Sequence, residues 1–404
     1  MALQRWTGRG WRKPGLASLG VGLVVIGVVV ASFVDAIGGH AAHPPSASSE
    51  ISTLDTAPST APPHIPGPVE AAGTVAFSPY LGVGDVGKGL YAVSPLGTPS
   101  RRLVGGDLCC PSWSRTGDLL LSETRARGGT ADVIIRPAQS HPSAVRVAGQ
   151  GMALGPGVWS SNGDRIALWA SNPPDRTVDG IYVYRLDGKS GRRITNAPVG
   201  RVERPLGYSP DASHVLYYEQ HVGRDAGAVY SIGVDGSRRV RLTPPGMTDW
   251  CCYFGSPASW SPDGRVTFAA FAPGAGGRAG LSAVFITNAD GSDRRRISGW
   301  GGWITSAHWS PDGRWIAFDR VNRAGGAHDL FLVRPDGTGL QIVPSASRDN
   351  GSCCAQWSPN GKALVYESGP AQDRMDLWVA NIDGSGIRRL THTPTSFYTF
   401  AWGR

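Results

Sequence analysis

Cysteine is the residue type whose spacing in this chain points most directly to chemistry. The six cysteines occur as three adjacent pairs, Cys109–Cys110, Cys251–Cys252 and Cys353–Cys354. Outside the cytoplasm thiols usually oxidise, although adjacent Cα atoms lie only about 3.8 Å apart and a bridge within a pair is strained. We predict vicinal disulfides in all three pairs and no metal ion or cofactor. A thiolate metal cluster is the alternative, but no histidine stands at a recognisable ligand spacing.

A second group with binding potential combines aromatic and polar residues in three stretches of the chain. Exposed aromatic rings beside a few polar groups suit the binding of a peptide, a glycan or another protein. The same rings could equally fill the mouth of a central channel. The predicted ligand-binding residues are Trp250, Tyr253, Phe254, Trp300, Trp303, His308, Asp349, His392 and Tyr398.

No residue pattern identifies an enzyme. The sequence contains no Gly-x-Ser-x-Gly elbow, no His-Glu-x-x-His motif and no phosphate-binding loop, so we assign no catalytic residue. The competing hypothesis is an envelope hydrolase or lyase that uses scattered ionisable groups at a channel mouth. Its site would be drawn from Arg201, Glu203, Arg204, Asp249, His308, Asp349 and His392.

A repeated element has to position these residues. The motif runs from Trp309 through Ser-Pro-Asp to Gly313, in which proline, aspartate and glycine favour a tight turn after a strand. Its leading aromatic residue recurs at intervals of 45 to 52 residues. A period of about 40 to 50 residues with strand patterning is typical of β-propeller blades. The aromatic positions are Trp113, Trp159, Tyr208, Trp260, Trp309, Trp357 and Trp402, and we expect them to pack in the core between blades.

A second motif alternates with the first and completes each blade. It is an apolar strand, an Asp-Gly turn and a short basic strand, which together predict a hairpin. The clearest copies are 181–195, 229–243, 284–298, 330–343 and 377–391, with weaker copies at 90–104 and 133–148. Each repeat then holds four strands, which we name A to D in chain order.

The two ends of the repeat region predict how the ring closes. Residues 74–77 read as a B strand without an A strand before it, and residues 400–402 as an A strand without a B strand after it. We therefore predict an all-β, seven-bladed β-propeller in which the C-terminal strand completes the first blade. A six-bladed ring is the alternative, and it would omit the weak copies near Trp113 and Val133.

The strand order also sorts the connections between two faces. A–B and C–D turns share one face, and the B–C and D–A connections share the other, which we call the loop face. We expect the cysteine pairs and the aromatic group in D–A connections on the loop face, where binding residues usually lie. Arginines cluster at the D strands, where charge protects a sheet edge from pairing; a basic rim that attracts anions is the alternative.

The N-terminal region predicts a membrane location. Residues 1–15 form a basic tail, and residues 16–37 are almost wholly apolar, long enough for one bilayer crossing at about 20 residues. A cleaved signal peptide is the alternative. Residues 38–70 are rich in proline and serine and predict a disordered linker. We expect a single-pass plasma-membrane protein with its N-terminus inside and residues 71–404 on the extracytoplasmic side.

The Trp-Ser-Pro-Asp-Gly turns and Asp-Gly hairpins of residues 74–404 resemble the TolB-like, WD40-like propeller repeat. The resemblance implies a family that includes periplasmic protein–protein adaptors. It also extends to the propeller halves of dipeptidyl peptidase IV-type and prolyl oligopeptidase-type proteins, whose α/β-hydrolase domain we do not expect here. The N-terminal domain of TolB is also missing from the pattern, so a Tol-system role is not implied.

These expectations combine into one hypothesis for function. We predict a membrane-anchored extracytoplasmic propeller that binds another envelope protein, a peptide or a glycan through its loop face. The exported location argues against nucleic acid, although the net charge is +8. The rival is the envelope hydrolase or lyase named above.

Overall fold

The computed structural model shows a propeller built almost entirely of strands. It describes residues 73–80, 89–105, 108–115, 117, 119–123, 132–136, 145–147, 152–172, 175–186, 191–222, 226–250, 256–273, 279–321, 328–344, 352–371, 374–392 and 397–403. The predicted basic tail, membrane segment and linker lie outside these residues. Among the described residues, no helix has the length and apolar character that a bilayer crossing requires.

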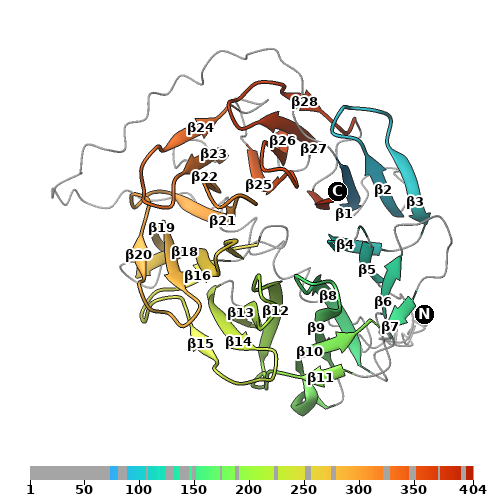
Figure 1. Cartoon of the computed structure of the whole chain (residues 1–404), viewed down its shortest axis with the longest axis vertical. Helices are drawn as coiled ribbons and strands as arrows, with labels where there is room; N and C mark the ends of the chain where they lie inside the picture. Colours follow the sequence, from blue (N-terminus) through green and yellow to red (C-terminus); the bar gives the residue numbers. More distant parts are fainter. Residues whose placement is uncertain are drawn as a thin grey trace, which may run out of the picture.

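The described strands form seven antiparallel sheets arranged around a common centre (Figure 1). Six sheets contain four strands, and β16 pairs additionally with β14 in the seventh. The six-bladed alternative would omit the repeat that contains Trp113 and Val133. In the structure this repeat forms a sheet of its own, made of β4 to β7. We number the blades in chain order, beginning with the sheet that contains β1.

The strand bounds follow the predicted A to D order in every blade. Blade 1 contains β29 (Phe397–Gly403), β1 (Thr74–Tyr80), β2 (Gly89–Val93) and β3 (Arg101–Gly105). Blade 2 contains β4 (Leu108–Trp113), β5 (Leu119–Glu123), β6 (Asp132–Arg136) and β7 (Val145–Val147). Blade 3 contains β8 (Ala153–Trp159), β9 (Arg165–Ser171), the 3-10 turn η1 (Arg176–Val178), β10 (Gly180–Arg185) and β11 (Gly191–Arg193). Blade 4 contains β12 (Arg201–Tyr208), β13 (His214–His221), β14 (Ala226–Gly233), β15 (Val240–Arg241) and β16 (Asp249–Trp250).

The remaining three blades repeat the same plan. Blade 5 contains β17 (Ala258–Trp260), β18 (Arg265–Pro273), β19 (Ala279–Asn288) and β20 (Arg295–Arg296). Blade 6 contains β21 (Trp303–Trp309), β22 (Ile316–Val321), β23 (His328–Val333) and β24 (Gln341–Val343). Blade 7 contains β25 (Ser352–Trp357), β26 (Ala363–Ala371), β27 (Arg374–Asn381) and β28 (Arg388–Arg389). In Figure 1 the A strands β4, β8, β12, β21 and β25 lie toward the centre, and the D strands lie at the rim.

The first and last strands of the ring pair with each other, as predicted. β29 and β1 align over seven residue pairs, from Thr74 opposite Gly403 to Tyr80 opposite Phe397. Pairing of the two ends leaves no open sheet edge between the first and last blades. The ring is therefore closed by its own terminal strands.

The repeated tryptophans pack between blades, as predicted, and also hydrogen-bond across them. Four indole N–H groups donate to a carbonyl of the preceding A strand, at the residue before its own aromatic position. The pairs are Trp113 to Ala401 at 3.1 Å, Trp159 to Ser112 at 3.0 Å, Trp260 to Gly207 at 3.3 Å and Trp357 to His308 at 3.0 Å. At these four junctions the neighbouring blades are thus held together by packing and by a directed bond.

The A–B turns depend on a serine, an aspartate and a glycine in fixed roles. In blade 6 the Ser310 hydroxyl donates to Asp312 at 2.6 Å and accepts from the Trp315 N–H at 3.0 Å. Gly313 closes the turn with a φ of 71°, in the left-handed region that glycine adopts without cost. The motif that identifies the repeat therefore has a structural role, which is to make the turn.

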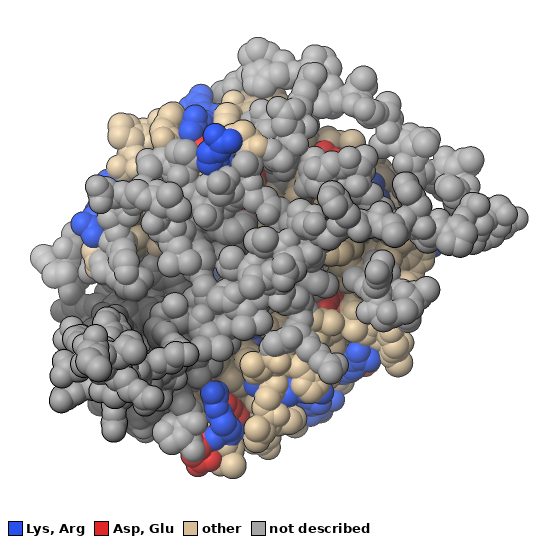
Figure 2. Space-filling view, turned by 180° about the vertical axis from the view of Figure 1, so that it is seen from behind, with Lys and Arg blue, Asp and Glu red and all other residues tan. Residues whose placement is uncertain are grey.

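Arginines occupy the outermost strands, as the sequence predicts. Arg192 donates to the Asp235 carbonyl of the next blade at 2.8 Å, and Arg388 donates to the Leu96 carbonyl of blade 1. Seen from behind, the visible basic side chains lie in separate groups toward the periphery (Figure 2). At these two positions the arginines also join the rims of neighbouring blades.

Candidate functional site

The predicted aromatic group is only partly within the described residues. Tyr253, Phe254 and Asp349 lie outside them, and so do the side chains of Trp250 and Tyr398, whose backbones lie in β16 and β29. That these residues bind a ligand stays a prediction.

The two described tryptophans of this group are partly buried and pack on the core. Trp300 lies edge-on to Phe285 with ring centroids 5.9 Å apart, and the Arg296 guanidinium lies 5.2 Å from its ring centre. Trp303 lies edge-on to Phe271 at 6.4 Å. Each ring is therefore packed against a phenylalanine of blade 5.

The two histidines of the predicted site differ in environment. His392 is exposed, at the end of the D-strand region of blade 7. His308 lies in β21 beside Trp309, and burial lowers its pKa to about 4 against the opposing charge of Asp319. His308 is thus neutral near pH 7, and the structure does not place it with His392.

Arg201 and Glu203, two residues of the enzyme hypothesis, belong to one cluster in blade 4. Glu203 on β12 pairs in register with Glu219 on β13, and both side chains are buried. Glu219 accepts from Arg201 and from Arg239, each at 2.7 Å, and Glu203 accepts from the Thr195 hydroxyl. The cluster therefore holds two buried carboxyl groups beside two partly exposed guanidinium groups.

The surroundings of Glu203 change its proton affinity. Burial raises the pKa of Glu203 to about 7, against the opposing hydrogen bond from Thr195. Arg239 also donates to the Tyr217 hydroxyl at 2.6 Å and lies 4.1 Å from the Tyr230 ring centre. A carboxyl group with a pKa near 7 can donate or accept a proton at neutral pH.

Glu219, Arg239 and Thr195 were missing from the predicted site. Glu219 carries a usable signal, because it interrupts the apolar run of β13 as a buried charge. Its partner Arg239 is one of the arginines near the D strands. From the sequence alone, all of these arginines were predicted to be exposed charges at the rim. The register that joins them is a long-range property of the sheet.

The cysteine pairs require two corrections. They were expected in D–A connections, but Cys109 and Cys110 belong to β4, and Cys353 and Cys354 belong to β25. Cys353 and Cys354 are not disulfide-bonded, so the predicted vicinal disulfide is wrong for this pair, whereas Cys110 is disulfide-bonded. Cys251 and Cys252 lie outside the described residues, as does the Cys109 side chain.

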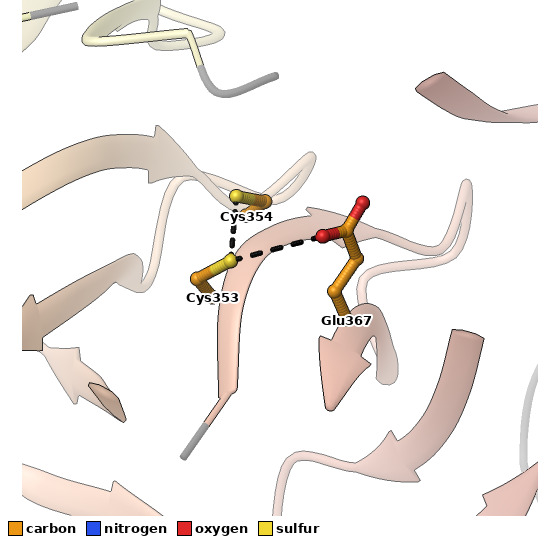
Figure 3. A group of neighbouring side chains, drawn as sticks. All are labelled: Cys353, Cys354 and Glu367. Carbon is orange, nitrogen blue, oxygen red and sulfur yellow. Dashed lines mark hydrogen bonds between the residues drawn. The ribbon is translucent and has the colours of Figure 1, made fainter. Parts of the chain in front are cut away.

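The thiols of Cys353 and Cys354 form a compact group with the carboxyl group of Glu367 (Figure 3). The two sulfur atoms of Cys353 and Cys354 lie 2.8 Å apart, and Cys353 Sγ lies 4.0 Å from Glu367 Oε2. All three side chains are buried, and their ligand atoms lie within 4.8 Å of one another. Two thiols and a carboxylate are a donor set that could hold a metal ion.

A shallow pocket opens on the face opposite the loop face, beside the A–B and C–D turns of blade 6. It has a volume of about 480 Å³ and is lined by Arg314, Trp315, Arg334, Pro335 and Asp336. The Arg334 guanidinium lies 5.3 Å from the Trp315 ring centre. No predicted site residue contributes to it.

Comparison with known proteins identifies short sequence matches. No family model matches the chain. The Tol-Pal system protein TolB of Syntrophus aciditrophicus is 41% identical over 61 residues, which are 15% of this chain and 13% of that protein. Dipeptidyl-peptidase 5 of Porphyromonas gingivalis is 28% identical over 149 residues, 35% of this chain and 22% of that protein. The matches span less than a quarter of either relative.

Solved structures match over most of the chain at low identity. A prolyl endopeptidase has a TM-score of 0.55 at 10% identity, covering 82% of this chain and 50% of its own. Oligogalacturonate lyase of Vibrio parahaemolyticus has a TM-score of 0.52 at 14% identity, covering 79% and 86%. The fold and the repeats thus agree: the chain is a β-propeller similar to those of TolB, oligogalacturonate lyase and the prolyl oligopeptidase-type proteins.

Proposed function

We propose that this chain is an extracytoplasmic propeller that binds an envelope protein, peptide or glycan through its loop face. The observation that carries the proposal is the closure of the ring by β29 and β1. A closed ring of paired sheets is a stiff frame, and connections on a stiff frame can present a preformed binding surface. The short match to a protein of the Tol-Pal system supports an envelope partner.

The proposal includes an anchor formed by residues 16–37, with the propeller outside the plasma membrane. Its support is the apolar sequence after a basic tail. Protease treatment of intact cells that express the full chain tests the topology. Digestion of the propeller, with residues 1–15 protected, supports the anchor; a propeller released free of the membrane supports a cleaved signal peptide.

Two half-buried tryptophans on opposite faces give a matched test of the binding face. Trp300 lies in a D–A connection, and Trp315 follows an A–B turn; both rings contact an arginine. Partners are cross-linked to the full-length chain in intact envelopes, with Trp300→Ala and Trp315→Ala compared with the native chain. We expect Trp300→Ala to reduce cross-linking about tenfold or more, as loss of an aromatic hot spot does.

Thermal unfolding of both variants excludes general loss of structure. If Trp315→Ala loses the partner and Trp300→Ala keeps it, the turn face binds and the loop-face proposal is wrong. Should both variants keep every partner, binding through Trp300 or through Trp315 is excluded.

A second candidate function is an envelope lyase or hydrolase, and the pKa of Glu203 near 7 favours it. The carboxyl group could act as a general acid or base beside Arg201 and Arg239. Oligogalacturonate, the substrate named for one structural neighbour, is the first probe. Formation of unsaturated product by the native chain and its loss in Glu203→Gln would support catalysis; no product from either would count against a lyase on this substrate.

A further inference from the structure

The thiol group of blade 7 occupies a place where strand geometry is altered. In a regular strand successive side chains point to opposite faces. β25 is irregular between Cys353 and Gln356, and Cys354 has a φ of 61°, in the left-handed region. A bulge of this kind re-aims a side chain, so both thiols can lie on one side of the strand. Their 2.8 Å separation is the result.

The equivalent place in blade 6 contains two hydroxyl groups where blade 7 has two thiols. Counted back from the repeated tryptophan, Thr305 and Ser306 correspond to Cys353 and Cys354, and the strand register makes Asp319 the counterpart of Glu367. Both hydroxyl groups of blade 6 donate to the Asp319 carboxylate. Although burial acts to raise it, hydrogen bonds from His328, Ser306 and Thr305 hold the pKa of Asp319 below its usual range.

Blade 7 keeps the carboxylate and replaces both hydroxyl groups by thiols. A thiol is a weak hydrogen-bond donor, but as a thiolate it is a soft metal ligand. The exchange therefore places two potential thiolate ligands beside the carboxyl group, so that three metal-ligating groups lie around one point. A hydroxyl-to-thiol change at both adjacent positions alters which ligand this group of side chains can bind.

Blade 2 supplies the matched contrast. Cys110 has a φ of 62°, nearly that of Cys354, and its strand has the same irregularity four residues before the tryptophan. The residue paired with Cys109 is Ser122, whereas the residue paired with Cys353 is Glu367. Cys110 is disulfide-bonded, whereas Cys353 and Cys354 are not. The pair without a disulfide is the one whose strand register sets it opposite a glutamate.

We propose that Cys353, Cys354 and Glu367 bind a thiophilic divalent cation of the zinc type. Zinc takes thiolate and carboxylate ligands at about 2.0 to 2.3 Å, so tetrahedral ligand atoms lie about 3.3 to 3.8 Å apart. Rotation of the cysteine side chains that opens the sulfurs by about 1 Å meets that spacing. Calcium does not suit the group, because it requires six to eight oxygen ligands.

The binding step balances without a redox partner. Two thiol protons pass to solvent as two metal–sulfur bonds form, and the Glu367 carboxylate supplies the third bond. A water molecule completes four-coordination, as at other sites with three protein ligands. The site lies on the innermost strand of blade 7 and does not depend on the proposed loop-face function.

Cobalt titration of the reduced, metal-free full-length chain tests the site, because cobalt–thiolate bonds give a charge-transfer absorption. We expect saturation near one ion for this site, displacement of cobalt by Zn²⁺, and loss of the signal in Cys353→Ser/Cys354→Ser. Glu367→Gln should weaken cobalt binding about tenfold or more. Loss of a hydrogen-bond partner of a metal ligand already costs about that much, and Glu367 is a ligand itself. Cys110→Ser, at the equivalent backbone position of blade 2, should keep the signal.

Mass-mapped alkylation keeps the test decisive if a variant fails to fold, because it uses the native chain. Zn²⁺ should protect Cys353 and Cys354 from alkylation, and chelator should restore their reaction. The proposal is overturned if the reduced native chain shows no cobalt–thiolate absorption, if the double serine variant keeps it, or if Zn²⁺ leaves alkylation of both thiols unchanged.

Discussion

The indole N–H of Trp113 donates to the carbonyl of Ala401 at 3.1 Å, although 288 residues separate the two in the chain. β29 is therefore held on two sides, by pairing with β1 in its own blade and by Trp113 of blade 2. The C-terminal strand is the element on which closure of the whole ring depends.

Removal of residues 397–404 from the full-length chain should open the ring. The truncation deletes all seven residue pairs with β1 and exposes Val75 and Phe77, which are buried in the intact fold. Loss of the buried Phe400 and Trp402 side chains alone should cost several kcal/mol, at about 3 to 5 kcal/mol for each large aromatic. Calorimetry and limited proteolysis measure the effect. A peptide of residues 397–404 added in excess should restore part of the stability; truncation without a fall in melting temperature would contradict closure by β29.

Trp357→Phe should destabilise the fold more than Trp309→Phe. The Trp357 indole N–H donates to the His308 carbonyl, whereas the Trp309 indole nitrogen is buried without a hydrogen-bond partner. Both replacements keep an aromatic ring, so packing losses are similar. Loss of the bond leaves the carbonyl unsatisfied, at about 1 kcal/mol or more. Chemical denaturation of the two variants gives the comparison; equal losses would show that the bond adds nothing to interblade packing.

The native chain should become less stable as pH rises from 4.5 to 7, and Glu203→Gln should abolish this part of the pH dependence. The folded-state pKa of Glu203 is about 7 against a usual 4.5, so the folded state binds the extra proton between these values. Native stability should therefore fall between pH 4.5 and 7, by at most about 3 kcal/mol from this group. The amide variant should show a flatter profile in thermal unfolding across that range. Parallel profiles of variant and native chain would mean that Glu203 has an ordinary pKa.

His308→Gln should have the opposite pH signature. The pKa of His308 is lowered from 6.5 to about 4, so the unfolded state binds more protons between these values. The native chain should lose stability as pH falls from 6.5 to 4, by roughly 1 to 3 kcal/mol from this residue. The variant should lose less over the same interval, as measured by urea unfolding at each pH. A steeper acid loss in the variant than in the native chain would be inconsistent with a neutral, enclosed His308.

The sequence by itself determined the repeat, the strand order and the closing strand. Tight turns and hairpins are local structures. The serine, aspartate and glycine of a turn such as that at 310–313 therefore predict the turn without knowledge of the fold. The spacing of Trp113, Trp309 and Trp402 then located the blades, because each aromatic residue fills the same place between sheets.

Tertiary structure alone decided which side chains meet. The bulge in β25 turns Cys353 and Cys354 to one side of the strand, and the register sets Cys353 opposite Glu367. From the sequence we had predicted that these cysteines lie in a connection and form a disulfide. Sheet register likewise brings Glu203 to Glu219 in blade 4. The physical reason is that register and bulges depend on pairing between strands, and a shift of one residue reverses the face of every side chain.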